Sequence, residues 1–200
     1  MFDFELINQY DALIFDMDGT LIDTMPSHTL AWEKVGEVLG YPIKGDVMYE
    51  FAGAPTKVIA EETMRLYGVP LELEEQLVIL KRNFGRKLVI EKATLLPTIQ
   101  VLQHFYRKKP LALGTGSHQS MVDLLLNHFN LAHYFNAMVV AEDVKQHKPA
   151  PETFLRCAEL LNVEPKHCLV FEDADFGVQA ALAGGMDVWD IRFNNIITNK

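Results

Sequence analysis

Short apolar runs recur along the 200-residue chain, separated by longer segments with helical periodicity. Strands that are buried on both faces read as near-continuous hydrophobic runs, which is typical of parallel sheets covered by helices. Five such runs predict parallel strands, at residues 12–15, 111–113, 137–140, 168–171 and 188–191.

Helical periodicity precedes or separates the last four of these runs. The predicted helices cover residues 98–106, 119–129, 152–161 and 176–183. Gly184 and Gly185 follow the last of them, and glycine is the usual residue just beyond the C-terminus of a helix. This alternation predicts an α/β fold, a doubly wound parallel sheet with right-handed crossovers.

The first strand breaks the rhythm, because about 95 residues separate it from the second. This segment predicts only helices, at residues 27–39, 56–67 and 73–90, with breaks at Tyr41-Pro42, Gly53-Ala54-Pro55 and Gly68-Val69-Pro70. We therefore expect two domains. Residues 1–22 and 94–200 form the core, and residues 23–93 form an inserted α-helical cap over the carboxyl edge of the sheet.

Polar residues follow the first four predicted strands, at the edge where open α/β sheets bind their ligands. Asp16 and Asp18 follow the first strand, Gly114-Thr115-Gly116-Ser117 the second, Lys148 the third, and Glu172-Asp173 the fourth. Four acids, one lysine and one helix N-terminus are thus expected to meet at a single edge.

Four carboxylates in a small space repel one another. At an effective dielectric constant of about 20, one like-charge pair at about 4 Å costs on the order of 4 kcal/mol. A hard divalent cation with oxygen ligands relieves this repulsion, and Mg²⁺ suits one or two carboxylates combined with a substrate phosphate. The residues named above at the strand ends include no His or Cys, the ligands typical of zinc.

The other groups at this edge suit a phosphoryl substrate. Thr115 offers a hydroxyl, and the amides of Gly116 and Ser117 lie at a helix N-terminus, where anions bind readily. Lys148 can neutralise phosphate oxygens as a point charge. An aspartate nucleophile can form an aspartyl-phosphate, and Asp18, two residues further along an extended chain, can exchange a proton with the leaving oxygen.

Four segments of the chain together resemble the motifs of the haloacid dehalogenase superfamily, in order and spacing: FDMDGTLIDT, LGTGSHQS, HKPAPETFLRCAEL and VFEDADFGVQAA. They are most similar to the β-phosphoglucomutase-like subfamily, and within it to the fructose-1-phosphate phosphatase branch. The position of the insertion resembles that of the helical-cap class.

The resemblance implies a role for each matching residue. Asp16 matches the nucleophile and Asp18 the general acid/base, while Thr115 and Lys148 match the phosphate-binding residues. Asp16, the backbone carbonyl of Asp18, Glu172 and Asp173 match the Mg²⁺ site, with direct or water-mediated coordination by Glu172 left open. The implied substrate is a small sugar phosphate.

Several alternatives remain open. Mutases of the subfamily tend to carry an arginine where Thr56 stands, so its absence favours hydrolysis over β-phosphoglucomutase activity, although Lys57 is adjacent. Two further alternatives are disfavoured. Dehalogenases of the superfamily lack the second acid and the metal ligands, both of which this chain has, and phospho-accepting receiver modules lack the predicted cap. His28 and Trp32 share one helix face, directed either to the site or into an interface, and Asp175 is a candidate N-cap.

Composition narrows the choice of partners. The net charge is −9 and no basic run compensates it, which disfavours nucleic acid and anionic membranes. Cys157 and Cys168 lack metal-type spacing and are interpreted as buried small hydrophobes. We expect a cytoplasmic monomer or weak homo-oligomer whose partner is a small phosphorylated metabolite.

Overall fold

Six strands form one sheet in a computed structural model that describes residues 2–51 and 54–199. The strands are β1 (Ala12–Phe15), β4 (Leu111–Gly114), β5 (Ala137–Val139), β6 (Cys168–Glu172), β7 (Asp187–Asp190) and β8 (Asn195–Ile197). Their order across the sheet is β5-β4-β1-β6-β7-β8, and only β8 runs antiparallel to its neighbour. The predicted α/β fold is confirmed, and β8 is an addition to it.

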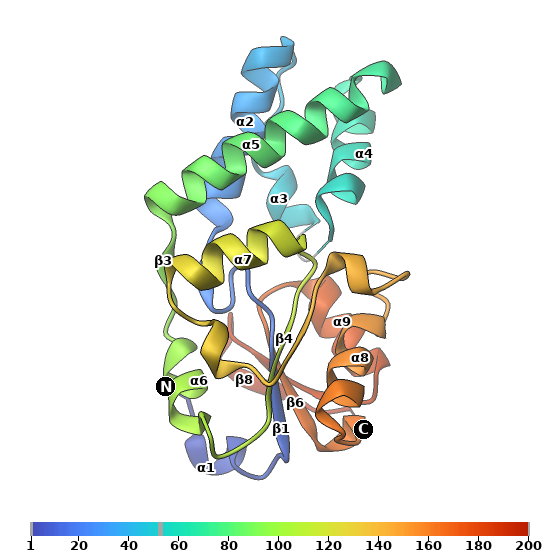
Figure 1. Cartoon of the computed structure of the whole chain (residues 1–200). Coiled ribbons are helices and arrows are strands. Elements are labelled where there is room, and N and C mark those ends of the chain that lie inside the picture. Colours follow the sequence, from blue (N-terminus) through green and yellow to red (C-terminus); the bar gives the residue numbers. More distant parts are fainter. Residues whose placement is uncertain (1, 52–53, 200) are drawn as a thin grey trace.

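Helices cover both faces of the sheet, as the buried strands require (Figure 1). The helices of the core are α1 (Phe4–Ile7), α6 (Ile99–Phe105), α7 (Gln119–His128), α8 (Glu152–Leu161) and α9 (Asp175–Ala183), with short 3₁₀ turns at η2 (Ala132–Tyr134), η3 (Ala141–Asp143) and η4 (Pro165–His167). Successive side chains of β1 point to opposite faces. Leu13 and Phe15 therefore join the cluster under α6 and α7, while Ala12 and Ile14 join the cluster under α8 and α9.

The segment of residues 23–93, between β1 and β4, is mainly helical and lies beyond the carboxyl edge of the sheet (Figure 1). It contains α2 (Met25–Leu39), α3 (Val47–Glu50), α4 (Thr56–Tyr67), η1 (Leu71–Leu73) and α5 (Glu74–Lys92). Its apolar side chains, among them Trp32, Ile59 and Leu77, form a cluster of their own. Of the predicted breaks, Gly53 lies outside the described residues, and α3 is a short helix that the pattern did not predict.

The chain enters and leaves this helical segment through two short strands that lie side by side. β2 (Ile22–Asp23) and β3 (Thr94–Leu95) form a two-stranded antiparallel ribbon in which Ile22 pairs with Leu95 and Asp23 with Thr94. Residues 23–93 are called the insertion below, and the division into two domains at this ribbon stays a prediction. Among the described helices, none is long and apolar enough to cross a bilayer.

Candidate active site

The carboxyl ends of the central strands bring distant residues together. Asp16 directly follows β1, Thr115 directly follows β4, and Glu172 is the last residue of β6. Because β1 pairs with both β4 and β6, these three positions are neighbours along one edge. Lys148 reaches the same place from the segment after β5 and η3.

Lys148 joins two of the predicted acids. Its Nζ donates to Asp16 Oδ1 at 2.7 Å and to Glu172 Oε2 at 2.8 Å, and all three residues are buried. Burial alone would lower the pKa of the Lys148 amine, but the two carboxylates raise it above its ordinary value. The ammonium therefore stays charged and has a fixed direction toward the end of β1.

Three carboxylates gather into a cluster that fits a dication. Asp16, Glu172 and Asp173 each offer an oxygen, and these oxygens lie within 4.8 Å of one another. Burial and the Glu172 carboxylate raise the pKa of Asp16 well above its ordinary value against the Lys148 charge, and they raise that of Asp173 to about 7. One lysine thus does not balance the buried acids, and a hard cation with oxygen ligands would.

The turn after β1 makes room for this cluster. Gly19 has φ +83°, a conformation that favours glycine, and its N–H donates to Ile22 O at 2.8 Å. A Cβ at Gly19 would lie 2.1 Å from Asp173 Oδ2. Asp173 is also held by the Thr20 hydroxyl, which donates to Oδ1 at 3.0 Å. Glycine here is needed both for the turn and for the close approach of Asp173.

Glu172 differs from its two acidic neighbours in how its carboxylate is held. Its Oε2 accepts from Lys148, and its Oε1 accepts the backbone N–H groups of Asp173 and Ala174 at 3.2 and 3.1 Å. A Cβ at Gly177 of α9 would lie 2.0 Å from Glu172 Oε2, so this carboxylate also depends on a glycine. These contacts fix the direction of both oxygens of the Glu172 carboxylate.

Asp18 lies beside the cluster but makes a different set of contacts. Its Oδ1 accepts from the Thr24 hydroxyl at 2.6 Å and lies 3.3 Å from His28 Nε2, and its Oδ2 accepts from the Ser117 hydroxyl at 2.6 Å. Burial would raise the pKa of Asp18, but His28 and the hydroxyl donors hold it at about 2. The Asp18 carboxylate is therefore ionised and oriented by three side chains.

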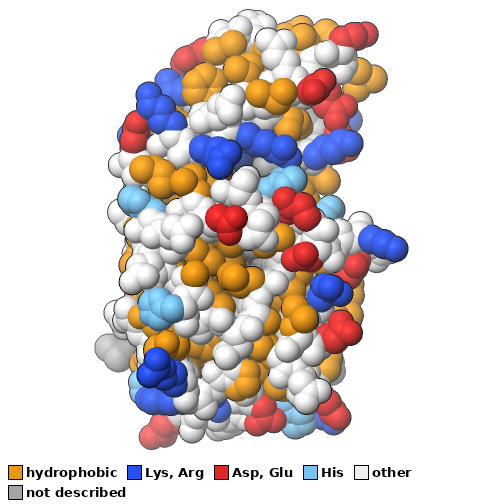
Figure 2. Space-filling view, viewed as in Figure 1, with side chains coloured by type: hydrophobic (Ala, Val, Ile, Leu, Met, Phe, Trp, Pro, Cys, Tyr) orange, Lys and Arg blue, Asp and Glu red, His pale blue; other side chains and the backbone are white. Residues whose placement is uncertain are grey.

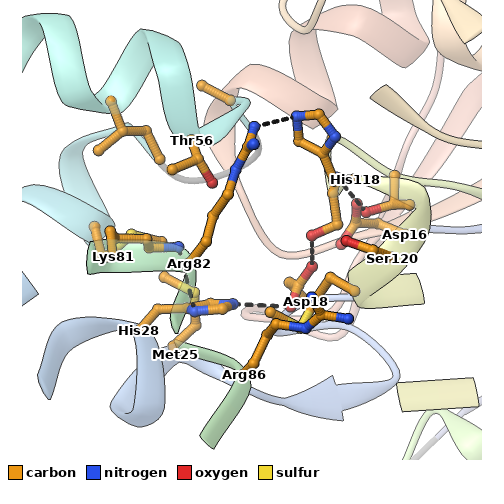
Figure 3. A pocket seen from close by; sticks show the side chains of 17 residues that line it. Asp16, Asp18, Met25, His28, Thr56, Lys81, Arg82, Arg86, His118 and Ser120 are labelled. Atoms are coloured by element: carbon orange, nitrogen blue, oxygen red, sulfur yellow. Dashed lines mark hydrogen bonds and ion pairs between the residues drawn. The ribbon is translucent and has the colours of Figure 1, made fainter. Parts of the chain in front are cut away.

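His28, in α2 of the insertion, connects Asp18 of the core to α5 (Figure 3). Its Nδ1 lies 3.5 Å from the Nζ of Lys81, a buried lysine of α5 whose ammonium is also 5.9 Å from the centre of the Trp32 ring. Burial lowers the pKa of Lys81 to about 8, and burial together with the Lys81 charge lowers that of His28. Lys81 was missed in the sequence, although a lysine between Leu77 and Gly85 on the buried face of α5 is a usable signal.

The loop after β4 places three of the four predicted phosphate-binding residues, Thr115, Gly116 and Ser117, in one pocket with Asp16 and Asp18. The fourth, Lys148, contacts Asp16 but is not among the residues that line this pocket. Thr115 is buried, and its Oγ1 accepts the Ser117 N–H at 3.0 Å. Gly116 lies between them, and α7 begins two residues after Ser117. The sequence predicted only that the backbone amide of Ser117 would bind phosphate. In the structure its hydroxyl also binds Asp18.

The pocket lies between the insertion and the edge of the sheet (Figure 3). On the insertion side it is lined by apolar residues such as Met25, Met48 and Ile59, and by the cations Lys81, Arg82 and Arg86 of α5. Thr56 lines it as well, whereas Lys57 is exposed and pairs with Glu74 at 3.9 Å. The two arginines were not predicted, because their position depends on how α5 packs over the core.

Asp175 does not cap a helix as expected. It is the first residue of α9, where Ala174 has the extended backbone of the N-cap position with φ −118°. The Asp175 carboxylate accepts from Arg192 Nη1 at 2.7 Å instead. An acid in the first turn still complements the helix dipole, so the position suits Asp without a capping hydrogen bond.

Comparisons with known proteins agree with this arrangement. Residues 10–185 match the haloacid dehalogenase-like hydrolase family. The chain is 44% identical over 190 residues to fructose-1-phosphate phosphatase YqaB of Escherichia coli (strain K12), covering 94% of this chain and 99% of that protein. It is 33% identical over 186 residues to a phosphorylated carbohydrates phosphatase of Thermotoga maritima, covering 88% and 82%.

A solved structure shows the same fold. The β-phosphoglucomutase of Clostridium difficile superimposes with a TM-score of 0.78 at 27% identity, covering 90% of this chain and 83% of that one. The relatives thus include both phosphatases and a mutase, on a common architecture.

Proposed function

Because the chain belongs to the haloacid dehalogenase-like hydrolases, we propose that it removes the phosphoryl group from a small sugar phosphate of the fructose 1-phosphate type. The family match and the similarity to two phosphatases identify it as a phosphoric monoester hydrolase. The finer proposal includes Mg²⁺ as cofactor, an aspartyl-phosphate intermediate and a small phosphorylated metabolite as partner. The insertion (residues 23–93) is the cap in this proposal, and the remaining residues are the catalytic core.

The observation that carries the proposal is the contrast between Asp16 and Asp18. Asp16 is buried against Lys148 and two further carboxylates, with one oxygen held by the lysine. Asp18 is two residues away, yet its carboxylate contacts hydroxyls and an imidazole. Two acids with such different surroundings suit two roles, nucleophile for Asp16 and proton carrier for Asp18.

In the first half of the reaction, an Asp16 oxygen attacks phosphorus and the bond from phosphorus to the sugar oxygen breaks. The departing oxygen takes a proton from Asp18, giving the free sugar and a phosphoryl group bonded to Asp16. Because Asp18 is ionised in this structure, it must gain that proton when substrate binds. The charge of a phosphate dianion raises the pKa of a neighbouring carboxylate in the required direction.

In the second half, Asp18 accepts a proton from water as the water oxygen attacks phosphorus. The bond between phosphorus and the Asp16 oxygen breaks and inorganic phosphate leaves. Asp16 is again a carboxylate, and Asp18 carries a proton as it did at the start of the first half, which it releases to solvent when phosphate departs. Thr115, Gly116, Ser117 and Lys148 are the proposed phosphate-binding residues, with the Lys148 ammonium stabilising charge on the transferring group.

The proposed metal ligands are Asp16, Asp18 through its backbone carbonyl, Glu172 and Asp173. A bound Mg²⁺ would neutralise the carboxylates and phosphate oxygens, so that the anionic nucleophile can approach an anionic substrate. Glu172 is best suited to a water-mediated contact, since its two oxygens already accept three hydrogen bonds among the described residues.

Mutase activity is the second candidate, because the same covalent intermediate can return its phosphoryl group to a sugar. Thr56, rather than a cation, lines the pocket at the position where mutases tend to carry arginine, which favours hydrolysis. The test is a panel of sugar phosphates with Mg²⁺, measuring inorganic phosphate and isomerised sugar phosphate together. We expect phosphate release, and isomerisation without phosphate release would reject the proposal.

A further inference from the structure

One arginine of the insertion forms a direct bridge to the core. Arg82 extends from α5 along the pocket, and its guanidinium meets the imidazole of His118 (Figure 3). Arg82 Nη2 lies 2.5 Å from His118 Nε2, and His118 Nδ1 lies 2.5 Å from Glu142 Oε1. Arg82 belongs to the insertion, whereas His118 and Glu142 follow β4 and β5. The three side chains therefore form one continuous contact across the two parts.

The chemistry of the three groups allows one arrangement of protons. A guanidinium only donates, so His118 Nε2 must be the unprotonated nitrogen that accepts from Arg82. The proton of a neutral imidazole then lies on Nδ1, which donates to the Glu142 carboxylate. This assignment follows from the pattern of hydrogen bonds, and it defines His118 as a neutral relay between a cation and an anion.

The core end of this bridge is anchored to the loop that bears Thr115 and Ser117. The Glu142 carboxylate also accepts the backbone N–H of Gln119, at 3.1 and 3.2 Å to its two oxygens. The N–H of Ala141 donates to Ser117 O at 3.0 Å. His118 directly follows Ser117, whose hydroxyl binds Asp18, so the bridge is adjacent in the chain to a contact of the proposed proton carrier.

The bridge is also part of the lining of the pocket. Arg82 and His118 both line the pocket, so their contact forms part of its wall. In Figure 2 a band of Lys and Arg side chains crosses the molecule at the level of α5, and His and acidic side chains lie just below it. Opposite charges thus face each other across the junction of the insertion and the core.

We propose that Arg82 is a positioning residue, which holds the insertion against the core by donating to His118 and thereby aligns the loop that binds phosphate. The inference rests on the proposed function, because alignment matters only for a reaction at Asp16. Arg82 acts through His118 and does not touch the leaving group.

The size of the effect is limited by solvent. The His118 side chain is 35% exposed and that of Glu142 is 44% exposed, so water competes for each contact. Even exposed ion pairs contribute at most about 1 kcal/mol, and a contact to a neutral imidazole contributes no more than this, which corresponds to about a fivefold change in an equilibrium. We therefore expect Arg82→Met and His118→Phe each to lower kcat/KM about fivefold, with partial rescue by Arg82→Lys.

A double-mutant cycle separates this role from direct substrate binding. If Arg82 acts only through His118, the double variant should lose about fivefold, as each single variant does, because the second substitution removes nothing further. Independent losses that multiply to about 25-fold would overturn the proposal. Arg65→Met is the matched control, since Arg65 is a cap arginine on α4 that pairs with Glu62 on the exposed surface.

A distance measurement tests the bridge without turnover. Spin labels at Val38→Cys in α2 and Gln103→Cys in α6 report the separation of insertion and core, because both sites are exposed and the native cysteines are buried. With Mg²⁺ and inorganic phosphate present, Arg82→Met and His118→Phe should shift the distribution to longer distances, and to the same extent. Unchanged distances would overturn the proposal, even if the protein hydrolysed no phosphate ester.

Discussion

The edge of the sheet and the insertion contribute to the pocket in different ways. Asp16, Lys148 and Glu172 are 3%, 3% and 0% exposed, and two of them are placed by strands that pair directly. On the insertion, His28 and Lys81 are buried, but Arg82 and Arg86 are exposed and project from one helix. The comparison teaches that the groups at the edge of the sheet are fixed by backbone pairing, whereas the groups that the insertion adds to the pocket depend on helix packing.

The strongest way to break this comparison is to remove the proposed nucleophile. Asp16→Asn keeps the shape of the side chain but should lower kcat by about 10⁵ or more, because an amide cannot form the acyl phosphate. Steady-state phosphate release measures the loss, and circular dichroism checks the fold. Asp11→Asn is the matched control, because Asp11 is an exposed acid at the opposite end of the same strand. Substantial residual turnover would place the nucleophile elsewhere.

Removal of divalent metal tests the same edge without changing the sequence. Chelation with EDTA should lower the rate by about 10³–10⁴, and Mg²⁺ should restore it, since the acid cluster then lacks its counter-charge. Thermal melting gives a second readout. Mg²⁺ should raise the melting temperature of the stripped wild-type protein, and should do so much less for Asp173→Asn. A rate that is indifferent to chelator would contradict the proposed metal site.

Asp18 lies at the boundary between the two regions, and its substitution should cost less than that of Asp16. Asp18→Asn keeps an oxygen that can accept from Thr24 or Ser117 but loses the transferable proton. We expect kcat to fall by about 10²–10⁴, the usual contribution of general acid–base catalysis. Phosphate release from an ester with a good leaving group, such as p-nitrophenyl phosphate, should fall less than phosphate release from a sugar phosphate. Equal losses for both would exclude the acid role.

Lys81→Met sharpens the comparison from the insertion side. The variant keeps the buried stem but removes the cation that faces His28, so kcat/KM should fall about tenfold, the effect of a charge-assisted contact of about 1.4 kcal/mol. Stability should not fall, because replacing a buried charge with an apolar group of similar size is often neutral. Lys87→Met, on the exposed part of the same helix, is the control. A large drop in melting temperature would indicate a structural role for Lys81.

The two regions also differ in how far the sequence predicts them. The apolar runs of β1 and β6 mark buried strands, and an acid at the end of such a run has its neighbours set by strand pairing. Asp16, Glu172 and Asp173 could therefore be predicted to meet, although the chain separates Asp16 from the other two by more than 150 residues. Their proposed chemical roles follow from the family resemblance and stay predictions.

The missed features have local causes. β2 and β3 hold two residues each, which is too short for a hydrophobic period, and β8 (Asn195–Ile197) begins with a polar residue at the sheet edge. Arg82 and Arg86 look like solvated residues of an amphipathic helix until α5 is placed over α7. Asp175 was assigned to the wrong position because the helix begins one residue earlier than its pattern indicates.

The narrow ribbon of β2 and β3 has a practical consequence for protein engineering. Asp23 and Thr94 are paired residues of neighbouring antiparallel strands, so their Cα atoms are about 5 Å apart. A two-residue turn such as Asn-Gly spans that gap in ordinary hairpins. The 70 residues between them could thus be excised and the ends rejoined, or another module could be grafted at the same junction. A truncated enzyme of this kind would leave its acids open to bulky phosphorylated macromolecules.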